Sequence, residues 1–311
     1  SINDCYYSKI SSSRKVNGLV GLVATLSAQP RTCTLVALGD VQLGRGTSRA
    51  IARHGAVGMW AGIDDLLADA DLRVANLECP VTCVGRPVDK KYCFRADPSR
   101  AKAVLRAGGI DVVSLANNHT QDWGPRGLAE TRRWLNAWGI TTAGAGQGEV
   151  AAAGVRVRVV RGLRVGFVGY SEWVMQPAQP GPAHAHLARL NEATLAAEIA
   201  AAKARVDCLV VSLHWGQEYQ ARPSARQQRL GRAAIDAGAD LVLGHHPHVA
   251  QPIETYRGKP IVYSLGNAIF DREGSARWSN GLVVRLELGR DRARVVDKKG
   301  IWTRAGRPVR R

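Results

Sequence analysis

Six short apolar segments alternate with helical patterns along this chain, and each segment ends near a polar residue of a kind that binds metals or moves protons. Such alternation is typical of α/β proteins, in which the carboxyl ends of parallel strands share one edge of a sheet. We therefore expect an α/β fold with one site at that edge. The strand-like segments are Thr34–Leu38, Leu72–Leu77, Ile110–Leu115, Asp207–Leu213, Leu241–Leu243 and Ile261–Leu265.

Helical periodicity fills the intervals between these segments. Pro125–Trp138 begins with proline at a natural first-turn position and stops before Gly139. Asn191–Ala204 and Ser224–Ala237 have the same periodicity. Two β-hairpins are also expected, over residues 155–168 and 282–302.

One domain is expected over residues 34–302. Residues 1–33 are expected to form an extension, in which a basic pair precedes the apolar stretch Val16–Ala28 and resembles a weak signal or anchor. A cytoplasmic location is nevertheless preferred over export or membrane anchoring. Residues 303–311 are expected to form a basic tail.

The charge of the chain limits the class of its ligand. The 311 residues carry a formal net charge of +17, which favours anionic partners, although arginine is abundant everywhere in the chain. No uncharged apolar run reaches the roughly 18 residues that a membrane span needs. The basic residues form no stripe interleaved with aromatic residues, so nucleic acid is not an expected partner.

Carboxylate, amide and imidazole groups gather at the predicted strand ends, where five of the eight histidines lie. This mixture of ligands suits Mn, Fe or Zn ions and argues against a thiolate site. Each residue alone would also suit a helix cap, a turn or a buried loop. Together they predict a metal centre formed by Asp40, Glu78, Asn118, His119, His214, His246, His248 and Asn267.

Taken in order, the motifs at these strand ends resemble the bacterial CapA family, the capsule and poly-γ-glutamate synthesis proteins of the calcineurin-like metallophosphoesterase superfamily. The resemblance extends from about Thr34 to Asp271 and rests on the ordered set of motifs. The matching segments are Leu38–Val41, Ala75–Glu78, Ser114–His119 with Asp122 and Gly124, Leu213–Gly216 with Glu218, Gly238–Asp240, Gly244–Val249, Tyr263–Asn267 and Lys91–Pro98 with Phe94.

This resemblance implies a four-layer αββα sandwich of the calcineurin-like metallophosphoesterase type, with the metal site at one end. It implies Asp40 as the first metal ligand, Glu78 as the bridging ligand and His119 as the acid that gives a proton to the leaving group. The further metal ligands would be Asn118, His214, His246 and His248. The side chains expected to support the ligands or the substrate are Asn117, His245, Glu218, Asn267, Lys91 and Arg95.

The loop from Cys79 to Arg95 leaves directly from Glu78, so we expect it to form part of the pocket wall. Lys90, Lys91 and Arg95 could then contact an anionic substrate. An ordinary solvated basic loop is the alternative interpretation.

Two positions depart from the superfamily pattern and leave the metal count at one or two divalent ions. Gln42 stands where the superfamily usually has histidine, and an amide is a weak ligand without an anionic form. Glu78 replaces the usual bridging aspartate, although glutamate at this position is itself typical of CapA proteins.

Three functions remain open from the sequence. The first is a metal-dependent hydrolase, phosphoesterase-like, resembling capsule and poly-γ-glutamate biosynthesis proteins. The second is a non-catalytic accessory or polymer-binding protein of a poly-γ-glutamate synthesis complex. The third is amide-bond chemistry at the same metal site. The expected partners are an anionic substrate or acidic polymer and a capsule synthetase complex.

Overall fold

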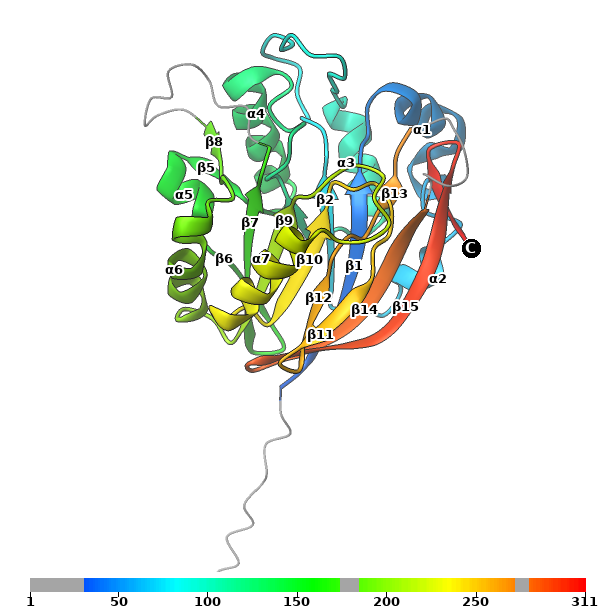
Figure 1. Cartoon of the computed structure of the whole chain (residues 1–311). Coiled ribbons are helices and arrows are strands. Elements are labelled where there is room, and N and C mark those ends of the chain that lie inside the picture. The colour runs from blue at the N-terminus through cyan, green and yellow to red at the C-terminus, as the bar shows by residue number, and fades with distance from the viewer. Residues whose placement is uncertain (1–30, 174–184, 272–279) are drawn as a thin grey trace, which may run out of the picture.

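Strand β1 (Cys33–Val41) is buried on both of its faces. Leu35 and Ala37 belong to a core that also contains residues of a second sheet, whereas Val36 and Leu38 belong to a core shared with helices. Because successive side chains of a strand point to opposite faces, this sheet needs an apolar cover on each side. The result is a layered arrangement of helices, sheet, sheet and helices (Figure 1).

The structure is a computed structural model that describes residues 31–173, 185–271 and 280–311. Most of the expected extension at 1–33 therefore lies outside the described residues. Among the described helices, none is long and apolar enough to cross a membrane.

The first sheet has the strand order β16-β15-β14-β1-β2-β3-β4, with β13 paired to the end of β1. Strands β1 to β4 and β13 are parallel, whereas β14, β15 and β16 join them in antiparallel fashion. The bounds are β2 (Leu72–Leu77), β3 (Val112–Ser114), β4 (Thr141–Ala143), β13 (Asn267–Ile269), β14 (Asn280–Gly289), β15 (Arg292–Arg304) and β16 (Arg307–Arg310).

The second sheet has the order β11-β12-β10-β9-β7-β6, in which β7, β9, β10 and β12 are parallel. A small two-stranded sheet pairs β5 with β8. The bounds are β5 (Ala145–Gln147), β6 (Arg156–Val160), β7 (Leu163–Ser171), β8 (Ala185–Leu187), β9 (Cys208–His214), β10 (Leu241–His245), β11 (Ile253–Tyr256) and β12 (Lys259–Val262).

Helices cover the outer face of each sheet (Figure 1). Helices α1 (Arg45–Gly58), α2 (Asp64–Leu67), α3 (Pro98–Ala107) and α4 (Gly124–Ala137) contribute to the core of the first sheet. Helices α5 (Glu149–Ala153), α6 (Glu192–Lys203) and α7 (Ala225–Asp236) contribute to the core of the second. The start of α7 is set by a capping box between Ser224 and Gln227, which satisfies free backbone N–H groups.

The four-layer sandwich expected from the sequence is thus confirmed. Three apolar cores separate its layers, and the middle core lies between the two sheets. Each fully buried large side chain in these cores, such as Phe167 of β7, contributes about 1.5–3 kcal/mol to folding.

The expected basic tail is wrong. Residues 303–311 contain the end of β15 and the strand β16, which pairs back on β15 with Val309 opposite Trp302. Ala305 and Gly306 both have positive φ, as the tight turns that match the twist of a hairpin require. The frequent arginines of this segment suggested a solvated tail, but they belong to a short strand in which Pro308 is buried.

The parallel strands of both sheets end on the same side of the molecule, which is the upper side in Figure 1. In register, Asp40 of β1 lies opposite Asn76 of β2 and Asn267 of β13. Gly39 allows this pairing, because a Cβ atom there would lie 1.9 Å from the carbonyl oxygen of Gly266. In the second sheet His214 lies opposite His245.

Candidate metal centre

The six predicted metal ligands meet at this shared edge of the two sheets. The first sheet supplies Asp40 and Glu78, and the loop after β3 supplies Asn118. His214 ends β9. Ligand atoms of Asp40, Glu78 and His214 all lie within 4.8 Å of one another. The loop after β10 completes the cluster with His246 and His248.

A buried asparagine holds the two carboxylates side by side. Nδ2 of Asn76 donates to Asp40 at 2.9 Å and to Glu78 at 3.0 Å. Nδ2 of Asn117 in turn donates to the oxygen of Asn76 at 3.0 Å. Asn76 was not among the predicted site residues, although an asparagine inside the apolar segment Leu72–Leu77 is a signal of a buried polar role.

Imidazoles surround the carboxylate of Asp40, which is fully buried. Nδ1 of His245 lies 3.2 Å from one oxygen and Nδ1 of His248 lies 3.3 Å from the other. Burial opposes the charge of Asp40, but the hydrogen bonds with the two histidines outweigh it and hold the pKa of Asp40 well below its ordinary value. Asp40 is therefore an anion, as a metal ligand must be.

Glu78 has the opposite tendency. Its complete burial and the neighbouring Asp40 charge raise the pKa of Glu78 well above its ordinary value. Its Oε1 atom is buried and has no hydrogen-bond partner among the described residues. A cation between the two carboxylates would remove both costs.

Two imidazole nitrogens likewise have no hydrogen-bond partner among the described residues. Nδ1 of His214 and Nδ1 of His246 are buried and accept or donate no hydrogen bond to any described residue. Burial lowers the pKa of His246 to about 4 and that of His214 well below its ordinary value, so both rings are neutral at neutral pH. Neutral imidazoles with free nitrogens, beside buried carboxylates, fit one or two divalent cations.

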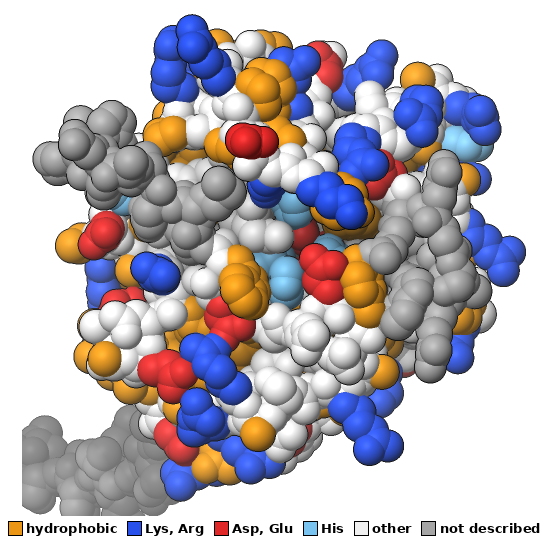
Figure 2. Space-filling model, turned by 45° about the horizontal axis from the view of Figure 1, so that its top comes forward, with side chains coloured by type: hydrophobic (Ala, Val, Ile, Leu, Met, Phe, Trp, Pro, Cys, Tyr) orange, Lys and Arg blue, Asp and Glu red, His pale blue; other side chains and the backbone are white. Residues whose placement is uncertain are grey.

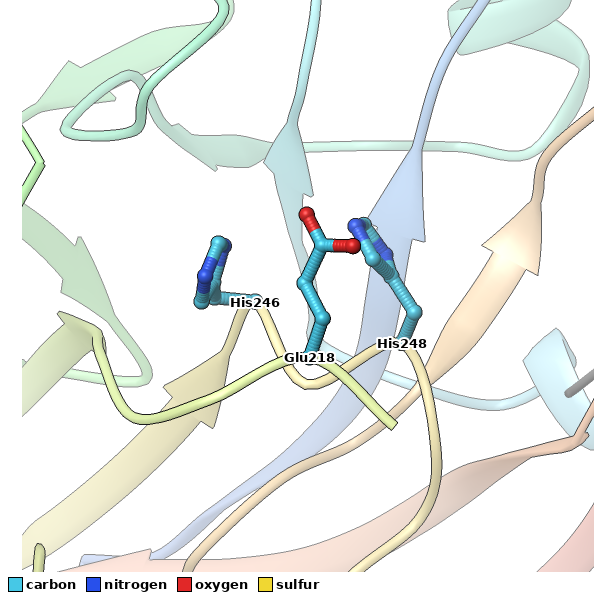
Figure 3. Close-up of side chains that lie close together, drawn as sticks. All are labelled: Glu218, His246 and His248. Atoms are coloured by element: carbon cyan, nitrogen blue, oxygen red, sulfur yellow. The ribbon is translucent and has the colours of Figure 1, made fainter. Parts of the chain in front are cut away.

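A second group of possible ligands adjoins the first. Ligand atoms of Glu218, His246 and His248 lie within 4.8 Å of one another. Figure 3 shows the Glu218 carboxylate reaching toward the two imidazoles from the loop after β9. Glu218, expected only to support the ligands or the substrate, therefore stands where it could itself hold a cation.

His248 differs from the other imidazoles in charge. Burial disfavours its cation, but Glu78 and Asp40 outweigh this and raise the pKa of His248 to about 9. Its Nδ1 also lies 3.0 Å from Oδ1 of Asn267, the residue expected to support the site. His246 and His248 both have positive φ, a backbone conformation that costs about 1–3 kcal/mol outside glycine and clusters at functional sites.

His119 lies at the edge of this cluster and is held in one orientation. Its ring stacks on Phe94 with centroids 4.0 Å apart, and its Nδ1 lies 2.8 Å from Asp122. Oδ1 of Asn117 accepts a hydrogen bond from the His119 backbone at 3.0 Å. Burial outweighs the effect of Asp122 and lowers the pKa of His119. The neighbouring Asn118 turns its Oδ1 away from His119, to Nε2 of His214 at 2.9 Å.

A pocket of about 360 Å³ opens beside His119, His248 and Glu218. Figure 2 shows histidine side chains at the bottom of a hollow that basic and hydrophobic side chains surround. The loop from Cys79 to Arg95 contributes Tyr92 and Phe94 to the wall, so its predicted position is confirmed.

The basic residues of that loop do not line this pocket. The ammonium group of Lys91 lies over the ring of Tyr92, and the guanidinium of Arg95 lies over the ring of Trp123 at 4.2 Å. Lys90 instead forms an ion pair with Asp122 and donates to the carbonyl of Asn118 at 2.8 Å.

The cations that do line the pocket are Arg45 and Arg49, on the first turns of α1. Sequence reasoning missed them. Their spacing of four residues, directly after the segment that contains Asp40, was the available signal, because such residues share one face of a helix.

Gln42 is fully buried near the site, and its oxygen accepts a hydrogen bond from the Thr47 hydroxyl at 2.9 Å. Its Nε2 atom has no partner among the described residues. The amide therefore turns its acceptor to Thr47, and the atom that remains is a donor that cannot ligate a cation.

Comparison with known proteins gives one family. The model of the bacterial capsule synthesis protein family, PGA_cap, matches residues 34–272. Capsule biosynthesis protein CapA of Bacillus anthracis is 31% identical over 288 residues, which cover 88% of this chain and 68% of that protein. PGA biosynthesis protein CapA of Bacillus subtilis (strain 168) is 32% identical over 259 residues, or 81% and 66% of the two chains.

A probable polyglutamine synthesis accessory protein of Mycobacterium tuberculosis is 37% identical over 220 residues, which cover 66% of this chain and 57% of that protein. This chain thus spans about two thirds or less of the length of these relatives. Among solved structures, a 5′-nucleotidase precursor of Thermus thermophilus aligns with 90% of this chain and 54% of its own, with 15% identity and a TM-score of 0.48.

Proposed function

This chain belongs to the bacterial capsule synthesis protein family, and we propose that it is a metal-dependent hydrolase of a phosphate ester in capsule or poly-γ-glutamate production. One observation carries the proposal. Carboxylates and neutral imidazoles from both sheets converge beside a pocket, and several of their ligand atoms are buried without partners. A protein that only bound a polymer would have no need for such a costly arrangement.

Two groups of residues would each hold one metal ion. Asp40, Glu78 and His214 would hold one divalent cation. Glu218 with His246 and His248 would hold a second, and its binding would release the proton that Glu78 and Asp40 favour on His248. A bound divalent cation supplies Lewis acidity toward a phosphoryl oxygen.

The protein's own side chains bind the substrate and supply the proton. Arg45 and Arg49 attract the anionic group into the pocket. His119 lines the same pocket with Nδ1 toward Asp122, and in its protonated, imidazolium form its Nε2–H would give a proton to the leaving oxygen. The stacked Phe94 ring and Asp122 together keep this imidazole in position.

A second function, binding of an acidic polymer within a synthesis complex, is favoured by one observation. The pocket cations lie outside the ligand cluster, and the side chain of Arg45 is 49% exposed, so both could contact a long anionic chain without any reaction. Amide-bond chemistry would use the same ligands on a γ-glutamyl link.

Metal analysis followed by an activity screen tests these functions. Purified protein is analysed for bound Mn, Fe and Zn, and is then assayed with Mn²⁺ against phosphoesters and γ-glutamyl compounds. We expect phosphoester hydrolysis that chelation abolishes and Mn²⁺ restores. The matched variants are Asp40→Asn, which should lose activity, and Asp64→Asn on α2, which should keep it. Hydrolysis of γ-glutamyl compounds alone, or bound metal without any hydrolysis, would overturn the phosphoesterase proposal.

A further inference from the structure

A second hollow of about 550 Å³ lies at the carboxyl edge of the second sheet. The end of β7 contributes Glu172 and Trp173 to it, and the start of α7 contributes Arg226. The segment before α6 contributes Arg189. The pocket beside His119 lies instead over the first sheet, whose strands β1 and β13 lead into Arg45 and Phe270.

The two hollows flank the metal centre on either side of one short loop. Gly216 and Gln217 line the second hollow, whereas the next two residues, Glu218 and Tyr219, line the first. The ring of Trp173 lies 6.0 Å from the ring of His246. Trp173 therefore separates the second hollow from His246 of the metal centre, whereas His248 itself lines the first hollow.

Each hollow also holds one arginine that has no counter-charge among the described residues. Arg45 pairs with Asp271, and Arg226 pairs with Glu172 and Glu192. The side chains of Arg49 and Arg189 form no ion pair or hydrogen bond with any described residue. Two unpaired cations on opposite sides of a metal centre suit a ligand with repeated negative charges.

Trp173 adds an apolar surface to the second hollow, on the side of His246. Trp173 is 50% exposed, so its apolar surface is open to a ligand in the hollow. An extended chain with alternating apolar linkers and anionic groups could pack its linkers on this ring while its anionic groups reach the arginines.

We propose that the two hollows are subsites for one linear polyanion, which lies across the seam between the sheets. One anionic group contacts Arg49, another contacts Arg189, and an internal repeat of the chain lies over the metal centre. This deepens the proposed function, on which it rests for the role of the centre. The repeat could carry carboxylates or phosphates, because both form charge-assisted hydrogen bonds with arginine.

Binding as a function of ligand length tests this arrangement. Fluorescently labelled oligo-γ-glutamates of increasing length, and inorganic polyphosphates of matched charge, are titrated with the full chain in about 0.15 M salt, which screens distant charges. Affinity should rise with length and then level off once both subsites are filled. Because polyphosphate has no apolar linkers, a weaker dependence on length for polyphosphate would support the contact with Trp173, whereas an equal or stronger dependence would overturn that contact.

Single variants separate the two subsites. Arg49→Ala should weaken binding of short and long ligands alike, and Arg189→Ala should weaken only the long ones, each by about tenfold. Arg106→Ala and Arg205→Ala are matched controls with the same change of charge. Arg106 precedes β3 and Arg205 precedes β9, so both lie at the amino ends of the strands, away from the metal centre. Both variants should bind as the native chain does.

The outcomes are distinguishable from those of the hydrolase test. In one outcome, affinity rises with ligand length, Arg189→Ala removes this rise, and no hydrolysis is found. That outcome would support the two subsites and exclude the hydrolase function. Hydrolysis of small phosphoesters together with binding that is independent of length, or an Arg189→Ala variant identical to the controls, would overturn the two subsites and leave the hydrolase function standing.

Discussion

The carboxylate of Asp40 lies 3.2 Å from Nδ1 of His245, although 205 positions separate the two residues in the chain. Asp40 belongs to the first sheet and His245 to the second. This buried contact therefore joins the two sheets at the edge where the ligands gather. A small sliding of one sheet against the other would separate the two halves of the metal centre, so packing between the sheets and metal binding depend on each other.

Replacing His119 and Glu78 should separate proton donation from metal binding. His119→Ala should keep its metal and lose about 10²–10⁴-fold in turnover, because only the positioned acid is removed. Glu78→Ala should lose both metal and activity, because a carboxylate of the cluster is removed. Metal analysis and rates on esters with poor and good leaving groups check this. The loss in His119→Ala should shrink for nitrophenyl esters, which need no proton, and an equal loss on both would contradict the acid role.

Asn76→Ala should destabilise the protein and weaken metal binding. The change removes the donor that both Asp40 and Glu78 use, and leaves Oε2 of the buried Glu78 without a hydrogen bond, whereas Oδ1 of Asp40 keeps only His245. The expected decrease in the free energy of unfolding is about 1–3 kcal/mol. Urea denaturation measures it, with Asn136→Ala on the exposed face of α4 as the control. Unchanged stability and metal affinity in Asn76→Ala would show that the carboxylates need no such support.

Glu218→Gln should lower the metal content from two ions to one. Glu218 is the carboxylate of the second ligand group, and an amide in its place has no negative charge for the cation. Titration calorimetry with Mn²⁺ and elemental analysis measure the stoichiometry, with Glu149→Gln on α5 as the control. If the native chain binds a single ion and Glu218→Gln still binds it, Glu218 is excluded as a ligand.

Asp207 should make stability depend on pH in the acid range. The Arg164 side chain donates to Asp207 at 3.1 and 3.3 Å, and the Arg164 backbone N–H donates to it as well. These hydrogen bonds lower the pKa of Asp207 from 3.8 to about 2. Because the folded state holds the carboxylate charged, this stabilisation is complete above about pH 4 and is lost as the pH falls toward about 2.

Urea denaturation between these pH values measures this effect. The stability of Asp207→Asn should fall less steeply with acid than that of the native chain. Arg164→Ala should reproduce part of the change, because the backbone N–H of residue 164 and the Arg290 guanidinium still face Asp207. Identical acid profiles for the native chain and both variants would be evidence against the pairing.

The strand-end motifs could be predicted well from the sequence. The segment Leu72–Leu77 is a strand with those bounds, and Ser224–Ala237 differs from α7 by one residue at each end. Short apolar segments and helix caps are local sequence patterns. They predict the elements well because these elements depend mainly on residues that are close together in the chain. Residues 303–311 were predicted wrongly because the pairing of β16 depends on β15, and no local pattern reveals a partner.

The neighbours of the ligands could not be predicted in this way. Arg189 lies in a segment with no motif, and the local signal for Arg49 is its spacing of four residues from Arg45. The two arginines flank the metal centre only because two different sheets end at one edge. The sequence by itself determined which ligand chemistry the chain offers and where each strand ends, since residue type and periodicity belong to short segments. The tertiary structure alone decided which atoms stay unpaired around Asp40 and Glu78, because hydrogen bonds and burial there depend on contacts between residues far apart in the chain.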